Sequence, residues 1–428
     1  MTSPATAGAD HARPAAAGSQ SHSRALATLM AVATAAVVAS ACGAGSAVPK
    51  AAAAPSTRSS GPATPSAKPP SEGEWRAFRA WLAQRAAAGM FSGAVLAAKD
   101  GKPLLEGGYG WADREARIRN TPATRFCIAS IGKLFTAVAV AQLVGAHRLS
   151  FGDTIGKYLT GFPPAVANHV TIAELLTMTS GLGDVALGTP DAPTTLGGMM
   201  KIISAEPLHS RPGTRFLYSN DGYIVLGAII QAVTGQSYHD YLRQHIFAPA
   251  GMTHTDVAVY TPAHVPDMAH GYTLASQNGP PPSAGAPGPG QNPAPGRAVR
   301  DDSGMPQAGN PSGGAYSTVG DLLAFARALL DHTLLSPAMT AAVLAPRVNA
   351  PQPGGPPVDM YTYGFAYQAI HGVTFVGHNG GTQGYEGQLD IYPTTGYAVI
   401  ILTNQDRVLL PAIQRSEAMI TGTQRKAP

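Results

Sequence analysis

Hydrophobic and polar positions divide the chain into an opening helix and hairpin, a helical middle and a strand-rich end. From about Glu72, large apolar residues recur at helical spacing, which predicts a helix containing Trp75, Phe78, Trp81 and Leu82. Two apolar runs, GAVLAAK and KPLLEGGYG, then flank Asp100-Gly101. Because Asp-Gly between apolar runs favours a tight reverse turn, this segment is predicted to be a β-hairpin.

The middle of the chain has helical periodicity, and strand patterns return only towards the end. We predict helices over residues 130–147, 171–178, 221–234, 238–247 and 319–330. Strands are expected over 363–369, 373–376, 384–392 and 398–403, followed by a closing helix from about Leu409. Residues 274–313 are rich in Gly, Pro and Ser, so they are expected to form a long irregular loop.

The order of these elements indicates a mixed α/β fold of the α+β sandwich kind. The early hairpin and the late strands are best joined in one antiparallel sheet. The helices would cover that sheet and also build a separate all-helical lobe inserted between its strands. A cleft between sheet and lobe is where a site is expected.

The N-terminal residues 1–42 have the parts of a targeting segment. A basic region with Arg13 and Arg24 precedes an uncharged apolar run at 25–41. Ala39-Ser40-Ala41 satisfies the small-residue rule for signal cleavage. The same residues resemble a lipobox ahead of Cys42, although alanine stands where leucine is usual. We therefore expect an exported, extracytoplasmic protein and leave open whether it is freely secreted or tethered to a membrane through a lipid on Cys42.

Residues 43–72 are mostly Ala, Pro and Ser and contain few large apolar groups. A segment of this composition cannot bury enough surface to fold, so it is expected to be a linker. The remaining residues, 73–425, would then form one folded domain.

Composition and charge exclude several classes of protein. Hydrophobic residues make up 44% of the chain and charged residues 13%, which permits a sizeable core. The formal net charge of +4 comes without a dense basic run, so no nucleic acid is expected as partner. The two cysteines, Cys42 and Cys127, are too few for a disulfide framework or a zinc site. We expect neither a cofactor nor a metal, and nothing in the sequence indicates an oligomeric state.

The first candidate motif is Ser130-Ile-Gly-Lys133, at the start of a predicted helix. Residues three apart share one helix face, so the lysine amine would lie beside the serine hydroxyl. A hydroxyl becomes a good nucleophile only when a base takes its proton, and a buried lysine can be that base. S-x-x-K alone also occurs by chance, as a capping serine and a solvated lysine.

Two further motifs could complete a site around Ser130. Tyr218-Ser-Asn220 places a phenol and an amide before a predicted helix, where the phenol could move protons and Asn220 could bind a substrate carbonyl or the lysine. The run from His378 to Gly381 lies between two strand patterns, and its glycines would let backbone approach a ligand closely. The N–H groups of Ser130 and Gly381 could bind an oxyanion. Capping residues and a glycine-rich hairpin are the alternative interpretations.

In this order and at these separations, the three motifs resemble the serine β-lactamase and penicillin-binding-protein superfamily, in particular its class C-type branch. Phrases such as VTIAELLTMTSGL, PGTRFLYSNDGYIVLGAII and GHNGGTQGYEGQLDIYP are similar to this branch, and the likeness covers roughly residues 75 to 405. The resemblance implies a β-lactamase/transpeptidase-like fold and hydrolysis through an acyl-enzyme, without a cofactor.

The resemblance also implies roles residue by residue. Ser130 corresponds to the acylated serine, Lys133 to the lysine that shares its proton, and Tyr218 to the tyrosine base. The substrate-binding and oxyanion positions are matched by Asn220, His378, Gly380 and Gly381.

The third motif departs from true β-lactamases, because His378 and Asn379 replace a lysine and a hydroxyl residue. A histidine is only partly charged near neutral pH, so carboxylate binding should be weaker. The sequence therefore favours a hydrolase of esters, amides or peptides with D-residues. A β-lactamase or D-alanyl-D-alanine carboxypeptidase remains an alternative, as does a non-catalytic cell-envelope binding or sensor protein with the same fold.

Overall fold

The structure is a computed structural model that describes residues 68–185, 193–257, 262–274, 298–303, 309–351 and 358–423. All of these residues belong to one compact unit that begins at Ser60. The predicted signal segment with Cys42, nearly all of the predicted linker and most of the predicted 274–313 loop lie outside the described residues.

The centre of the fold is an eight-stranded antiparallel sheet with the order β2-β1-β14-β13-β12-β11-β10-β9. The predicted hairpin and the late strands share this sheet, because β1 pairs with β14 from Gly93↔Thr403 to Lys99↔Tyr397. The strand bounds are β1 Gly93–Lys99, β2 Lys102–Tyr109, β9 Val348–Asn349, β10 Met360–Tyr361, β11 Ala366–Ile370, β12 Val373–Thr382, β13 Tyr385–Tyr392 and β14 Tyr397–Thr403.

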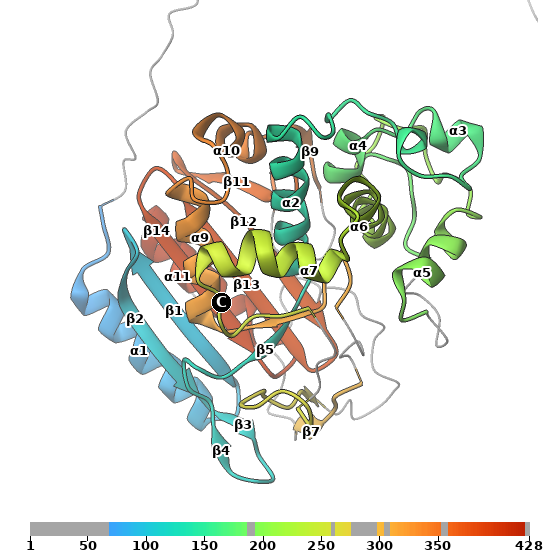
Figure 1. Cartoon of the computed structure of the whole chain (residues 1–428). Coiled ribbons are helices and arrows are strands. Elements are labelled where there is room, and N and C mark those ends of the chain that lie inside the picture. The colour runs from blue at the N-terminus through green and yellow to red at the C-terminus, as the bar shows by residue number, and fades with distance from the viewer. Residues whose placement is uncertain are drawn as a thin grey trace, which may run out of the picture. The chain divides into compact units, whose positions relative to one another are not determined.

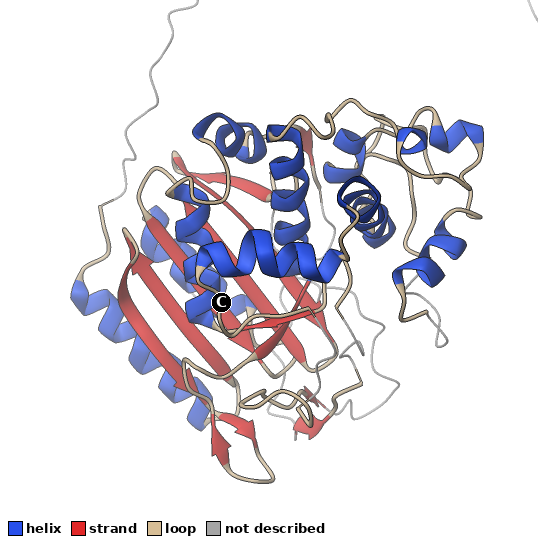
Figure 2. Ribbon diagram, viewed as in Figure 1, coloured by secondary structure: helices blue, strands red, loops and turns tan. Residues whose placement is uncertain are grey.

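Both faces of the sheet are covered by helices, which explains why β14 is buried along its whole length. Its alternate residues enter two separate cores: Ile400 and Leu402 pack on the face covered by α2 (Lys133–Gly145) and α9 (Val319–Leu330), while Val399 and Ile401 pack on the opposite face. Figure 2 shows the sheet between these helical layers. The period-two alternation of strands therefore builds a three-layer α/β arrangement.

The opposite face is covered by α1 (Glu72–Ala87) and α11 (Leu410–Thr421). A capping box starts α1, since the Ser71 hydroxyl accepts from the Glu74 backbone N–H and the Glu74 carboxylate accepts from the Ser71 backbone N–H. The helix then buries three of the predicted apolar residues: Trp75, Phe78 and Leu82.

A helical lobe lies beside the sheet and is inserted between β5 (Phe126–Ala129) and β8 (Ala315–Ser317), which pair with each other (Figure 1). Its helices are α3 Pro164–Ala167, α4 Ile172–Leu176, α5 Leu196–Ile203 and α6 Asn220–Thr234. The next helices, α7 Tyr238–Leu242 with a π-helical turn Arg243–Phe247 and α8 Ala248–Ala250, lie in front of the sheet in Figure 1, against α2 and α9.

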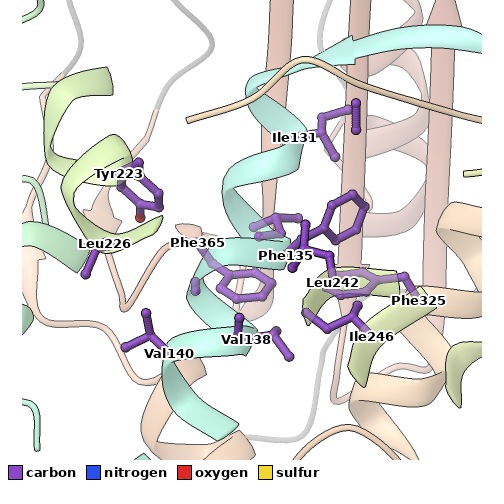
Figure 3. Close-up of a cluster of buried hydrophobic side chains, with 14 of the residues drawn as sticks. Ile131, Phe135, Val138, Val140, Tyr223, Leu226, Leu242, Ile246, Phe325 and Phe365 are labelled. Atoms are coloured by element: carbon purple, nitrogen blue, oxygen red, sulfur yellow. The ribbon is translucent and has the colours of Figure 1, made fainter. Parts of the chain in front are cut away.

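Helix α2 joins lobe and sheet and is apolar on nearly every side. Figure 3 shows its side chains, among them Phe135 and Val138, next to Leu242 of α7, Ile246 of the π-helical turn and Phe325 of α9. The rings of Phe135 and Phe325 meet edge to face at 5.0 Å. The start of α2 is thereby fixed in a rigid core.

The sequence prediction missed several elements and made one strand too short. Strand β12 was expected to end at Val376 but continues to Thr382 through the third motif, because residues 376–382 pair with β13. The unpredicted elements are β3 Trp111–Asp113, β4 Ile118–Arg119, β6 Tyr272–Leu274, β7 Ala298–Arg300, the short strands β5, β8, β9 and β10, the helices α3, α5 and α8, and α10 Pro337–Leu344.

Across the described part of the chain, the helices are too short or too polar to span a lipid bilayer.

Candidate active site

Ser130 lies at a sharp turn from strand to helix. Strand β5 ends at Ala129, and Ser130 opens a 3-10 turn, Ser130–Gly132, that runs directly into α2. Ala129 has φ 42°, a backbone conformation that favours glycine and costs about 1–3 kcal/mol in other residues. The turn is held in place by the neighbouring loop, where a β-carbon on Gly313 would lie 2.7 Å from the Ala129 carbonyl oxygen.

Two proton-carrying side chains converge on the hydroxyl of Ser130. The Lys133 Nζ lies 3.0 Å from Ser130 Oγ, and the Tyr218 hydroxyl donates a hydrogen bond of 2.9 Å to the same oxygen. The lysine is three residues along the helix from the serine, whereas the tyrosine comes from the segment before α6. The first two predicted motifs therefore meet at one atom.

Lys133 is fully buried and has three hydrogen-bond acceptors. Besides Ser130, its amine donates to Asn220 Oδ1 at 2.6 Å and to the backbone carbonyl of Ser312 at 2.5 Å. Burial penalises the charged ammonium and lowers the pKa of Lys133 to about 7, although the carboxylate of Asp184 acts in the opposite direction. An amine with this pKa can exchange a proton near neutral pH.

The start of α6 positions Tyr218 and Asn220. Ser219 caps the helix, since its hydroxyl accepts from the Gly222 N–H at 2.9 Å, and it donates to the Gly183 carbonyl at 2.7 Å. This ties the segment to the loop after α4. Burial raises the pKa of Tyr218 far above its usual value, so the side chain remains a neutral phenol.

Asp184 and Ser312 belong to the site, and the sequence analysis missed both. Asp184 Oδ2 accepts from Asn220 Nδ2 at 3.0 Å, which fixes the amide so that its oxygen faces Lys133. Ser312 contributes only its backbone carbonyl, which no sequence pattern could reveal. Asp184 could have been found from the sequence, because it directly follows the TSGLG phrase, which resembles the family.

The third motif lies on β12 close to Ser130. A β-carbon on Gly380 would lie 2.1 Å from the carbonyl oxygen of Ile128 and 3.2 Å from the backbone nitrogen of Ser130, so only glycine allows this approach. A β-carbon on Gly381 would meet nothing within 4 Å. Beyond Gly377, this edge of β12 has no partner strand among the described residues, so the backbone groups along it are not used in strand pairing.

His378 is buried beside this edge, with only 2% of its surface exposed. Its Nδ1 donates to the backbone carbonyl of Asn379 at 2.5 Å, so Nε2 accepts from the Tyr361 hydroxyl at 3.0 Å. Burial, together with the nearby charge of Lys133, lowers the pKa of His378 to about 3. The imidazole is therefore neutral at physiological pH, and both of its nitrogens have protein partners.

No group of three or more His, Cys, Asp or Glu residues within the described ranges is arranged to hold a metal ion. Cys127, three residues before Ser130, is buried in a small apolar cluster with Val265, Met268 and Tyr385.

A three-layer sheet structure with an inserted helical lobe, and a serine contacted by lysine and tyrosine beside the lobe, define the class of protein: the β-lactamase-fold serine hydrolases. The chain belongs to the beta-lactamase family, whose model matches residues 78–419. This confirms both the family resemblance and the α/β fold class that the sequence predicted.

Individual relatives agree with this assignment. A curated protein, Protein flp of Staphylococcus aureus strain MW2, is 37% identical over 169 residues, which cover 38% of this chain and 34% of that protein. The chain thus spans about a third of the length of this relative. The crystal structure of a penicillin binding protein from Bacillus halodurans has 29% identity and a TM-score of 0.67, covering 79% of this chain and 98% of that one.

The D-amino acid amidase of Ochrobactrum anthropi, solved with L-phenylalanine amide, shares the fold. It has 24% identity and a TM-score of 0.69, covering 82% of this chain and all of that chain (100%).

Proposed function

We propose that the protein hydrolyses esters or amides through an acyl-enzyme formed on Ser130. The observation that carries this proposal is the convergence of Lys133 Nζ and Tyr218 OH on one oxygen, Ser130 Oγ, at 3.0 and 2.9 Å. A nucleophile within hydrogen-bond reach of two proton carriers is the arrangement that activated-serine catalysis requires.

Lys133 is the better candidate for the base that activates Ser130. Its pKa of about 7 leaves much of the amine neutral at physiological pH, when it can accept the hydroxyl proton. The raised pKa of Tyr218 argues against a phenolate as the base. In this scheme Ser130 Oγ attacks the substrate carbonyl while its proton moves to Lys133.

Tyr218 then acts on the leaving group. As the tetrahedral intermediate collapses, the phenol donates its proton to the departing alcohol or amine, and the Lys133 ammonium restores that proton. The oxyanion would be bound by the backbone N–H of Ser130 and a second N–H on β12, for which Gly381 is the candidate because it directly follows Gly380, the residue at which β12 comes close to the Ser130 nitrogen. Water then hydrolyses the acyl-enzyme with the same groups in reverse roles.

The substrate class is narrowed by the neutral His378. A carboxylate in the substrate would find no positive charge at this position, since the pKa of His378 is lowered to about 3. This favours esters and amides, including peptides with D-residues, over β-lactams and D-alanyl-D-alanine peptides. The amide complex of the Ochrobactrum anthropi amidase fits this proposal.

A non-catalytic binding protein is the main rival. A binding protein has no need of a fully buried lysine with a lowered pKa. Burying an amine lowers the stability of the folded protein, so a buried lysine favours a catalytic role. Strained Ala129, directly before Ser130, also favours catalysis, because strain of this kind concentrates at functional sites.

The test is intact-protein mass spectrometry after treatment with a fluorophosphonate, combined with a p-nitrophenyl ester assay. The wild-type protein is expected to gain one adduct and to turn over the ester, because the activated hydroxyl attacks both reagents. Ser130→Ala should lose both properties, whereas Ser204→Ala at the end of α5 should keep them. A folded wild-type sample without adduct or turnover would overturn the proposal and favour the binding protein.

We further propose that the protein is exported, on the grounds of the sequence of residues 1–42. Mass spectrometry of the protein expressed from its full gene in a bacterial host should find cleavage after Ala41. A lipid-modified Cys42 at the new N-terminus would indicate a tether, and an unmodified one secretion. A full-length cytoplasmic product would contradict export.

A further inference from the structure

A small pocket lies on the sheet face opposite Ser130, directly behind the strand that carries the third motif. Alternation along β12 directs His378 and Gly380 towards the catalytic face and Asn379 towards this pocket. The register places Asn379 opposite Gln388 and Gly377 opposite Asp390 on β13. The pocket has a volume of about 20 Å³, which suits one water-sized ligand.

Three buried oxygens of this pocket have no hydrogen-bond donor from the protein: Asp390 Oδ2, Gln388 Oε1 and Gln368 Oε1. Their side chains are 2%, 8% and 6% exposed, so bulk water does not solvate them freely. The amide of Gln388 is oriented, because its Nε2 donates to Asp390 Oδ1 at 2.5 Å. Its oxygen is therefore left as an acceptor.

Asp390 is the one charged side chain among the described residues that line this pocket. Among the described residues Asp390 takes part in no ion pair, and the carboxylates of Asp390 and Glu417 on α11 both act on the hydroxyl of Tyr392. Burial raises the pKa of Asp390 above its usual range. A buried carboxyl without a cationic partner is unfavourable when ionised, and a cation beside it would relieve that penalty.

We propose that this pocket binds a small monovalent cation of the Na⁺ or K⁺ type, with Asp390, Gln388 and Gln368 as oxygen ligands. Carboxylate and amide oxygens are the hard donors that such ions prefer, and one carboxylate matches a single positive charge. A divalent ion would require more carboxylates. The ion would connect β11 to β13 behind β12 and so stiffen the strand that carries His378 and Gly380.

Thermal unfolding in NaCl, KCl and choline chloride at equal ionic strength tests this proposal without relying on catalysis. The midpoint is expected to be higher by about 2–4 °C in Na⁺ or K⁺ than in choline, which is too large for the pocket, and to rise with cation concentration. Asp390→Asn keeps the shape of the side chain but removes its charge, so it should abolish the difference. Asp331→Asn, at an exposed position after α9, should retain it.

A second variant keeps the test independent of the first. Gln388→Glu adds a carboxylate to the ligand set and should shift the preference towards Ca²⁺, seen as a larger midpoint increase in CaCl₂ than in NaCl. Equal midpoints in all monovalent salts for the wild type would mean that the pocket holds water only and would overturn the proposal. A difference that persists in Asp390→Asn would overturn it as well.

Discussion

Lys133→Met is expected to lower kcat/KM for ester hydrolysis by roughly 10²–10⁴-fold, because it removes the base that accepts the Ser130 proton. Methionine fills a similar volume without a charge, so the buried site should remain packed. The steady-state rate with a p-nitrophenyl ester measures the effect. Lys102→Met, at an exposed position of β2, should leave the rate unchanged.

The pH dependence of the wild-type rate is a second test of Lys133 as the base. The active form of Lys133 is the neutral amine, so kcat/KM should rise about tenfold per pH unit below its pKa of about 7 and level off above it. His378 should add no step above pH 5, since its pKa is lowered to about 3. A profile that rises only near pH 10, or a limb near 7 that survives in Lys133→Met, would assign the base to another group.

Tyr218→Phe is expected to reduce amide hydrolysis by roughly 10²–10⁴-fold while slowing p-nitrophenyl ester hydrolysis much less. An amine cannot leave without a proton, whereas p-nitrophenolate is stable as an anion. The phenol is the donor placed for this step, 2.9 Å from Ser130 Oγ. Rates for a series of esters with leaving groups of increasing pKa should show a steeper dependence in the variant than in the wild type.

Tyr397→Phe is the matched control, because Tyr397 belongs to the core on the opposite face of the sheet. It should preserve the leaving-group dependence of the wild type. An equal loss for all leaving groups in Tyr218→Phe would mean that the phenol only orients Ser130 and does not donate a proton.

The sequence predicted the parts of the fold in which local pattern and tertiary packing agree. Helix α9 lies over Val319–Leu330 as predicted, since its apolar face and its Thr318 cap are both local signals. The predicted strand ended at Val376, six residues before the end of β12, because histidine, asparagine and glycine are uncommon in strands. Pairing with β13 overrides that preference, and the third motif lies in regular sheet rather than in a turn.

For the site, the motifs predicted which residues take part, but not the pKa values and charge states of their side chains. The spacing of Ser130 and Lys133 places them side by side, yet the lowered pKa follows from burial that only the folded chain produces. The sequence left His378 partly charged, whereas burial, together with the nearby charge of Lys133, lowers its pKa and makes it neutral. Asp184 acts through Asn220, far away in sequence, so no local pattern connects them.

The pairing of β1 with β14 means that the central sheet can be completed only after nearly the whole chain has been made. Gly93 finds its partner only when Thr403 has been made, so the nascent chain carries an unpaired strand edge through most of its elongation. Contacts of such sequence separation form slowly, and an open edge can recruit other chains. Residues 378–382, which approach Ser130, also arrive late. Ser130 is therefore made early but acquires its complete surroundings only near the end of synthesis. Under the proposed function, hydrolysis would wait until the domain is whole, and chaperone protection of the growing sheet would be valuable.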